Sequence, residues 1–395
     1  MASLLEPGSH RASLVIGDEA LLAAMVRTEL AWLHALATAH MLNPQQIAAA
    51  GESLDAHLDP AVVEGAGNPV TALVRALRDK VDDPDVASLV HRGLTSQDTL
   101  DTALMLLARD GLDSVTTDLK SVATSLARLA ERHRGSVMAG RTLTQHAVPV
   151  TFGLKAAQWL VGVLEAARAV EAVRRRLPVQ CGGAAGTLAL AADLVADPLH
   201  LAGAFAERLG LTWPGMPWHT RRTPVTRLGD VLVEVCDALG VIASDVLLLG
   251  RPEVAEVREL PTAGRGGSST MPHKQNPVLA VLVRSAALQA PQLAAQLHQC
   301  AAQSVDERPD GAWHAEWPAL QRLLSLAVKA AAQAAELMLS LHVDPTAMRR
   351  RVEAAADKLL AERRRVQPGT PSSYLGLANA FVDAALQRFD CRTVP

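Results

Sequence analysis

The segment from Gly264 to Pro277 has the residue types most suited to chemistry in this 395-residue chain. Three of its first four residues are glycine, which frees the backbone to adopt positive φ and to move. Two hydroxyls, a lysine and an amide follow at Ser268, Ser269, Lys274 and Asn276. A helical pattern begins directly after Pro277, where unpaired backbone N–H groups attract anions. Such a mobile, cationic segment favours capture of a carboxylate substrate, although composition alone also fits a flexible linker.

A second polar group stands at the predicted start of a long helix. His91 is followed by Thr95-Ser96-Gln97-Asp98, in which Ser96 or Asp98 can cap the helix. Hydroxyl and amide groups at a helix N-terminus form a patch that suits an anion, but capping alone also explains them. The glycine-rich run from Gly182 to Thr187 lacks the lysine and hydroxyl of a P-loop and follows no convincing strand. It therefore does not predict a nucleotide site.

Long helices must position these segments, and the apolar periodicity predicts them at about residues 18–41, 70–80, 98–133, 149–176, 227–249, 277–304 and 316–341. Asp18 can cap the first of these helices. The sequence shows no alternating strand run of any length, Gly140 to His146 has the composition of a polar turn, and Pro149 opens the helix that follows. We therefore predict an all-α fold: an N-terminal helical domain (1–104), a central bundle of long helices (105–343) and a shortened C-terminal helical domain (344–395).

Composition excludes several classes of protein. The net charge of −3 gives no basic footprint for nucleic acid. The four cysteines form no CxxC pair, and no ligand-spaced cluster of His, Cys and carboxylates predicts a metal. The most apolar stretch, from Val231 to Leu249, is interrupted by three acidic residues and predicts a buried helix, not a membrane span. The N-terminus has no apolar run typical of a signal peptide, so we expect a cytoplasmic protein. Because no ligand-spaced cluster is present, we also expect neither a metal nor an organic cofactor.

Three separated segments together resemble the signature regions of the fumarase/aspartase superfamily. They are Thr95-Ser96-Gln97-Asp98, the run from Gly140 to Lys155, and the eleven residues from Gly267 to Pro277. The last is highly specific. Further stretches resemble the bacterial 3-carboxy-cis,cis-muconate cycloisomerase branch: Gly67-Asn68-Pro69, His91 to Ala103, Gln145-His146, Gly182 to Leu188, Pro217 to Thr220, and Gly311 to Trp317. The resemblance implies a homotetramer in which three subunits contribute segments to each active site.

The resemblance also implies roles for individual residues. Ser269 matches the family's proton-transfer serine, which loop closure and nearby cations would activate. Lys274 and Asn276 match positions that hold the substrate carboxylate. His146 is a second candidate catalytic residue, which could hydrogen-bond to a substrate carboxylate, and the alternative of a helix-entry histidine bonded to backbone has nearly equal weight. The remaining predicted substrate-binding residues are Thr95, Ser96, Gln97, His91, Arg141, Thr142, Gln145, Ser268, Met271, His219 and Arg222.

Three departures from the family pattern bear on the reaction. Adenylosuccinate lyase, the next nearest branch, has a histidine and a supporting glutamate where this chain has Leu143 and Val281. That pair protonates a poor leaving group, whereas a carboxylate with a pKa near ~4 leaves unaided. The family's usual aspartate after Arg222 is Thr223 here, and the region after about Ala356 is short.

These features predict an enzyme that converts 3-carboxy-cis,cis-muconate to 4-carboxymuconolactone, with a small polycarboxylate substrate and neither nucleic acid nor membrane as a partner. Loss of the acid pair also fits expulsion of nitrite. It counts against expulsion of an amine, as in adenylosuccinate lyase. The alternative is a C–N lyase of the same superfamily, resembling nitrosuccinate lyase or adenylosuccinate lyase. A catalytically silent homologue is a third possibility, motivated by the short C-terminus. The intact Ser268-Ser269, Lys274 and Asn276 argue against it.

Overall fold

The structure is a computed structural model that describes residues 4–39, 41–43, 45–48, 58–363 and 367–393. These residues form two compact units. Unit 1 comprises Met1–Asp113, Glu171–Leu232 and Pro291–Val328; unit 2 comprises Ser114–Val170, Val233–Ala290 and Lys329–Pro395. The division into three domains predicted from the sequence stays a prediction.

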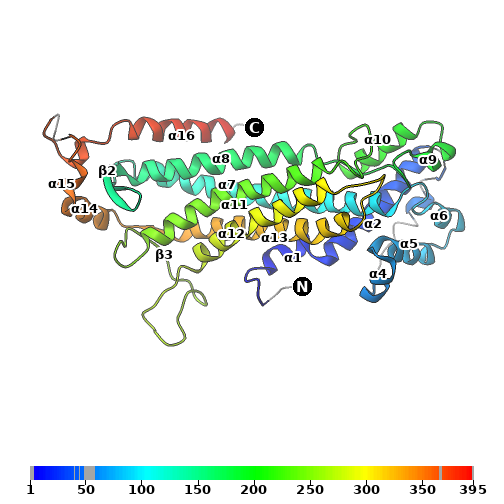
Figure 1. The fold of residues 1–395 in the computed structure, drawn as a ribbon, viewed down its shortest axis with the longest axis horizontal. Helices are drawn as coiled ribbons and strands as arrows, with labels where there is room; N and C mark the ends of the chain where they lie inside the picture. Colours follow the sequence, from blue (N-terminus) through cyan, green and yellow to red (C-terminus); the bar gives the residue numbers. More distant parts are fainter. Residues whose placement is uncertain (1–3, 40, 44, 49–57, 364–366, 394–395) are drawn as a thin grey trace. The chain divides into compact units, whose positions relative to one another are not determined.

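Helices dominate both units (Figure 1), in agreement with the predicted all-α class. The helices are α1 (His10–Ile16), α2 (Asp18–Thr38), α4 (Pro60–Ala66), α5 (Pro69–Lys80), α6 (Pro84–Leu89), α7 (Ser96–Arg132), α8 (Phe152–Arg174), α9 (Ala189–Leu194), α10 (Pro198–Leu209), α11 (Thr223–Leu249), α12 (Val278–Ala302), α13 (Gly311–Ser340), α14 (Pro345–Ala354), α15 (Ala356–Leu359) and α16 (Ala378–Thr393), with a short 3₁₀ helix at Pro371–Ser373. The strands are β1 (Val137–Thr142), β2 (Gln145–Thr151), β3 (Val257–Glu259) and β4 (Leu341–Val343).

Five of the shorter helices begin with the same two-residue signal, an Asp or Asn followed by proline. The carboxylate or amide oxygen accepts a hydrogen bond from a backbone N–H of the first turn, and the proline occupies a position whose N–H would otherwise be unpaired. The five pairs are Asp59-Pro60, Asn68-Pro69, Asp83-Pro84, Asp197-Pro198 and Asp344-Pro345. Helix α2, in contrast, has Gly17 at its N-cap, so Asp18 is its first residue and not the predicted cap.

The core of unit 1 contains large side chains contributed by α2 and α10. Trp32 and Phe205 are fully buried, and their rings meet edge to face with centroids 5.6 Å apart. Trp32 also donates its indole N–H to the carbonyl of Arg92, 2.9 Å away. Packing of α2 therefore helps to fix the chain that leads into α7.

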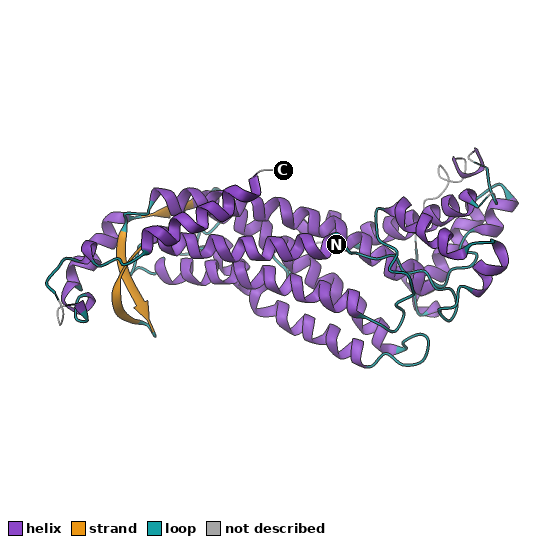
Figure 2. Ribbon diagram, turned by 90° about the horizontal axis from the view of Figure 1, so that it is seen from above, coloured by secondary structure: helices purple, strands orange, loops and turns teal. Residues whose placement is uncertain are grey.

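Unit 2 contains a β-hairpin that the sequence analysis did not predict. Strands β1 and β2 (orange in Figure 2) pair antiparallel, with Thr142 opposite Gln145. The predicted polar turn and helix start are therefore wrong, because α8 begins at Phe152, after Pro149 has paired with Ala139. Gly140 is required in this ladder, since a Cβ there would lie 2.5 Å from the carbonyl oxygen of Val148. A bulge between Ala139 and Arg141 breaks the alternation that identifies strands from sequence.

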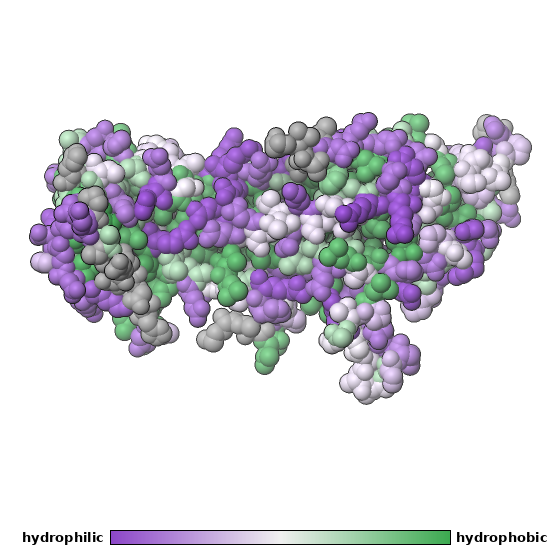
Figure 3. Space-filling model, turned by 180° about the vertical axis from the view of Figure 1, so that it is seen from behind, coloured by the Kyte–Doolittle hydropathy of each residue, from purple (hydrophilic) through white to green (hydrophobic). Residues whose placement is uncertain are grey.

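Within the described part of the chain, three helical stretches are long and apolar enough to cross a membrane by length and composition: His10–Thr38, Val278–Ala302 and Gly311–Ser340. Gly311–Ser340 has 72% of its most apolar window buried within the chain, whereas Val278–Ala302 has only 33%. Apolar (green) side chains reach the surface in several places in Figure 3. On α12 and α13, Leu288 is 69% exposed and Leu339 is 72% exposed. A single chain thus leaves much apolar helix surface uncovered.

Candidate active site

The carboxylate of Asp98 organises the polar residues of unit 1. It is fully buried at the third position of α7 and accepts the backbone N–H of Thr95 at 3.0 Å, which closes the first turn of the helix. It also accepts the N–H groups of Gly182 and Gly183, at 3.0 and 2.8 Å, and lies 2.8 Å from Nε2 of His219. Glycine is required at position 182, because a Cβ there would lie 2.8 Å from the His219 ring. The second glycine-rich run therefore wraps a carboxylate, not a phosphate.

Unpaired polar atoms gather around the start of α7. Eight buried side-chain atoms lack a hydrogen-bond partner among the described residues, and four of them lie here: Gln97 Oε1, His219 Nδ1, Arg308 Nε and Glu29 Oε2. The Gln97 amide donates to the carbonyl of His219 at 2.9 Å, and Arg308 donates to the Thr95 hydroxyl and, at 2.9 Å, to the carbonyl of Ala184. Buried polar groups are normally paired. Four unpaired polar atoms in one place are therefore available to hydrogen-bond to a polar ligand.

Arg222 does not offer a free donor to a substrate carboxylate, which corrects the prediction that it binds one. It is buried, with its guanidinium between Asp101, at 2.6 and 3.1 Å, and Glu316, at 2.7 and 3.1 Å. Burial raises the pKa of Glu316 although Arg222 opposes that change. Trp313 donates to Asp101 at 2.9 Å, and Gln180 does so at 3.2 Å. Arg222 thus holds the segment that follows His219 against α7 and α13.

The loop between β3 and α12 carries the predicted proton-transfer serine in unit 2. Figure 1 shows it as a long loop that projects from the helices of its unit. Two hydrogen bonds join the ends of this loop: the backbone N–H and the side-chain amide of Asn276 both donate to the carbonyl of Gly266, at 2.8 and 3.1 Å. Between these ends Ser269 and Lys274 are exposed. The Ser268 hydroxyl accepts the N–H of Met271 at 3.1 Å, so it shapes the turn beside Ser269.

The N-terminus of α12 is not available to an anion, contrary to the expectation from sequence. The Glu259 carboxylate, from β3, accepts the backbone N–H groups of Leu279 at 3.1 Å and Ala280 at 3.4 Å. Burial raises the pKa of Glu259, and these two bonds oppose the rise. An internal carboxylate therefore occupies the place predicted for a substrate group.

The β1–β2 hairpin carries four predicted site residues, of which two line a cavity and two are exposed to solvent. Arg141 makes a two-pronged ion pair with the fully buried Glu256, at 3.2 and 3.1 Å, so its guanidinium is held by the chain itself. With Thr142, it also lines a cavity of about 710 Å³ in unit 2. Gln145 and His146 do not line this cavity and are exposed near the hairpin tip.

The turn of the hairpin has strained geometry. Leu143 and Thr144 form a two-residue turn with φ values of 47° and 69°. This left-handed region normally requires Gly, Asn or Asp. Leu143 is 95% exposed. The turn thus holds an exposed leucine in a backbone conformation that is strained for a branched side chain.

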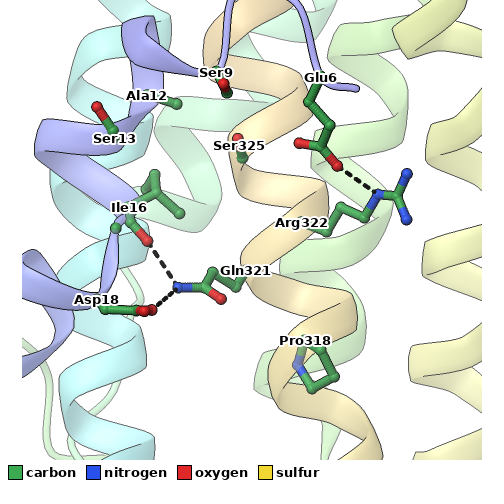
Figure 4. A pocket seen from close by; sticks show the side chains of 11 residues that line it. Glu6, Ser9, Ala12, Ser13, Ile16, Asp18, Pro318, Gln321, Arg322 and Ser325 are labelled. Carbon is green, nitrogen blue, oxygen red and sulfur yellow. Dashed lines mark hydrogen bonds and ion pairs between the residues drawn. The ribbon is translucent and has the colours of Figure 1, made fainter. Parts of the chain in front are cut away.

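A smaller cavity of about 240 Å³ in unit 1 contains none of the predicted site residues. Figure 4 shows it between α1 and α13. Its charged groups are paired, because Arg322 lies 3.4 Å from Glu6 and the Gln321 amide donates to the carbonyl of Ile16 at 3.0 Å and to Asp18 at 3.5 Å. These contacts join the N-terminal helix to α13, and we assign this cavity no chemistry.

Each unit thus assembles part of the predicted site. In unit 1 the structure brings Thr95, Ser96, Gln97 and His219 together at the start of α7, with His91 on the preceding turn. In unit 2 one loop carries Ser268, Ser269, Met271, Lys274 and Asn276, and the hairpin carries Arg141, Thr142, Gln145 and His146. Sequence reasoning missed Arg308 and treated Asp98 only as a cap. Asp98 could have been found from its place three residues after Thr95, whereas nothing in the sequence connects Arg308 to Thr95.

Comparisons with known proteins identify the family. A family model described as "Lyase" matches residues 15–291. The chain belongs to the fumarase/aspartase superfamily of lyases. It is 47% identical to nitrosuccinate lyase of Streptomyces davaonensis over 88% of this chain and 76% of that one. It is 41% identical to the 3-carboxy-cis,cis-muconate cycloisomerase of Pseudomonas aeruginosa, over 86% and 73%.

A solved structure gives the same assignment. The 3-carboxy-cis,cis-muconate lactonizing enzyme of Pseudomonas putida superimposes with a TM-score of 0.88 and 32% identity, over 97% of each chain. The predicted superfamily, the helical fold and an enzyme of the lyase or isomerase kind are therefore confirmed. These relatives carry out two different reactions.

Proposed function

We propose that this lyase expels a weakly basic anion from the carbon next to a carboxylate-stabilised carbanion, with nitrosuccinate as its substrate. The observation that carries the proposal is that Leu143 and Val281 are apolar, at the two positions that match the acid histidine and supporting glutamate of adenylosuccinate lyase. Both side chains are exposed in unit 2, at 95% and 49%, and neither can donate a proton. A substrate whose leaving group needs no proton is the one this pair permits.

The reaction needs one demanding proton transfer. Ser269 Oγ takes a proton from the methylene carbon beside one carboxylate of nitrosuccinate. The electrons of that C–H bond form the new C=C bond, and the C–N bond breaks with its electron pair leaving on nitrite. The products are a butenedioate, nitrite and one proton. Lys274 and the anion-binding start of α7 stabilise the negative charge that develops on the carboxylate.

A second candidate is opening and closing of the 3-carboxy-cis,cis-muconate lactone, the reaction that the sequence alone favoured. The leaving group is then a carboxylate, which equally needs no acid. The extent of the structural match to the Pseudomonas putida enzyme supports it. We place nitrosuccinate first because the identity to the nitrosuccinate lyase, at 47%, exceeds the 41% and 39% to two cycloisomerases.

We also propose that the protein works as a cytoplasmic homotetramer whose sites combine segments of different subunits. The poorly buried apolar window of α12 supports this, because burial of such surface drives association. The division of the predicted residues between two units is compatible with sites completed by other copies. The substrate proposed is a small polycarboxylate, with no nucleic acid, membrane or cofactor involved.

Leu143→His is expected to leave turnover of nitrosuccinate within about threefold of wild type, because nitrite departs without a proton. A working general acid contributes about 10²–10⁴-fold where one is needed. The measurement is kcat/KM for nitrosuccinate, with Leu143→Ala as the control for lost side-chain volume. A gain of tenfold or more on adding the histidine, alone or with Val281→Glu, would show that the leaving group does require protonation.

The proposed function is tested by giving the purified protein nitrosuccinate, 3-carboxymuconate and adenylosuccinate separately. We expect nitrite to be released from the first at the highest kcat/KM. Turnover of 3-carboxymuconate alone would establish the second candidate instead. Turnover of none would favour a catalytically silent homologue.

A further inference from the structure

His91 lies in a turn that side chains from two helices hold in a strained conformation. Its backbone φ is 61°, in the left-handed region that few non-glycine residues adopt. The carbonyls on either side of it are both fixed: Arg78 of α5 donates to Val90 at 2.9 Å, and Trp32 of α2 donates to Arg92 at 2.9 Å. Strain that the surroundings maintain in this way is typical of functional positions.

The His91 ring is oriented by a fully buried carboxylate. Glu29 Oε1, from α2, lies 2.7 Å from His91 Nδ1 and accepts the Thr99 hydroxyl at 2.7 Å. Its other oxygen, Oε2, is buried without a hydrogen-bond partner. A carboxylate at Nδ1 keeps a proton on that nitrogen and turns Nε2 away from α2.

His91 also lines a cavity of about 360 Å³ within unit 1. Arg75 and Arg78 of α5 and Ser96, the first residue of α7, line the same cavity, and Asp79 is its one acidic lining residue. The two guanidinium groups outnumber the one carboxylate among the lining residues, so the cavity lining carries a net positive charge that favours an anion.

We propose that Glu29 is a positioning residue, which holds His91 so that its Nε2–H binds a carboxylate of the substrate beside Arg75 and Arg78. The inference rests on the proposed function in one respect, that the substrate is a polycarboxylate. Neither Glu29 nor this cavity was among the predicted site residues. Glu29 acts only through His91 and touches no reacting atom.

The charge of His91 follows from the groups that face it. Burial opposes protonation, but the Coulombic attraction and hydrogen bond of Glu29, together with Asp98 of α7, outweigh it and raise the pKa of His91, while Arg78 opposes them. Since the imidazolium form donates from Nε2, carboxylate binding is strongest below the His91 pKa and weakens as pH rises through it. Replacing Glu29 by Gln keeps the shape but removes the charge, so the weakening moves to lower pH.

The test uses the full-length protein labelled with ¹³C at histidine Cε1 and titrated with pH by NMR, with and without succinate as an inert dicarboxylate. The His91 signal is assigned by its loss in His91→Asn. In wild type, succinate should raise the His91 pKa. In Glu29→Gln, the pKa should fall and the succinate response should move to lower pH. Glu19→Gln, an exposed glutamate on the same helix, should behave as wild type.

Two further variants separate positioning from folding. Thr99→Val leaves the Glu29 charge in place, so the His91 pKa should stay raised. If the pKa depended only on how tightly the turn is packed, this variant would lower it. His91→Asn should weaken succinate binding about tenfold, the loss expected for one charge-assisted hydrogen bond. An unchanged His91 pKa in Glu29→Gln, or a wild-type His91 that does not respond to succinate, would overturn the proposal. If His91 responds as described but neither nitrosuccinate nor 3-carboxymuconate is turned over, only the proposed function fails.

Discussion

Ser269→Ala is expected to reduce kcat for the protein's substrate by about 10³-fold, because it removes the group that takes the only demanding proton. KM should change little, since the carboxylates are held by other residues. Ser268→Ala is the matched control: its hydroxyl accepts the N–H of Met271 and shapes the turn, so its loss should have a much smaller effect. Equal losses in the two variants would remove the distinction between a reacting and a structural serine.

The same variant also tests whether sites are shared between subunits. Ser269 belongs to unit 2, and Gln97, at the start of α7, belongs to unit 1. Ser269→Ala and Gln97→Ala should each have low activity alone and should recover activity above either variant when mixed and refolded together. Recovery is possible only if some sites draw their intact loop and intact helix start from different chains. Failure of any mixture to recover activity would contradict the shared-site proposal.

Arg222→Leu is expected to lower the free energy of unfolding by about 3–5 kcal/mol, the cost of leaving buried charges without their partner. Asp101 and Glu316 would then face each other without the guanidinium that now separates them. The measurement is urea unfolding near neutral pH. Arg221→Leu is the matched control, because Arg221 is the exposed neighbour and its loss should cost less than about 0.5 kcal/mol.

The loss in Arg222→Leu should depend on pH in a defined direction. Burial already raises the pKa of Glu316, and without Arg222 the folded-state pKa rises further above the unfolded value. At pH values above the unfolded-state pKa, the buried, charged Glu316 carboxylate lowers the free energy of unfolding of the variant. This loss becomes smaller as the carboxyl group is protonated. The difference from wild type should therefore shrink as pH falls from neutrality towards ~4.3. A loss that stays constant over this range would mean that lost packing, not uncompensated charge, is responsible.

Long helices were predictable from the sequence because their apolar periodicity extends over many turns. The predicted helix at 277–304 matches α12 (Val278–Ala302) to within two residues at each end. The one predicted at 227–249 ends with α11 (Thr223–Leu249) but starts four residues late. Element boundaries failed where tertiary contacts decide them. Helix α13 begins at Gly311, five residues before the predicted start, because Trp313 and Glu316 are drawn into the buried Asp101 and Arg222 network.

The candidate site was predictable where it is contiguous in sequence and not where it depends on distant partners. The loop from Gly264 to Pro277 carries its chemistry in consecutive residues, so its composition was sufficient to single it out. The partners of Arg141 and Arg222 lie 115 and 94 positions away, at Glu256 and Glu316, and no local pattern reveals that these arginines are already neutralised. Free and paired arginines look alike in a sequence.

The most direct test of the central claim is how kcat/KM depends on the basicity of the leaving group. A series of 2-substituted succinates that expel nitrite, a carboxylate, a thiolate and an amine would be given to the wild-type protein. Because Leu143 and Val281 supply no proton, kcat/KM should fall steeply along this series, with ready release of nitrite and no detectable release of amine. Comparable turnover of the amine and nitro compounds would mean that another group acts as the acid, and the account would be wrong.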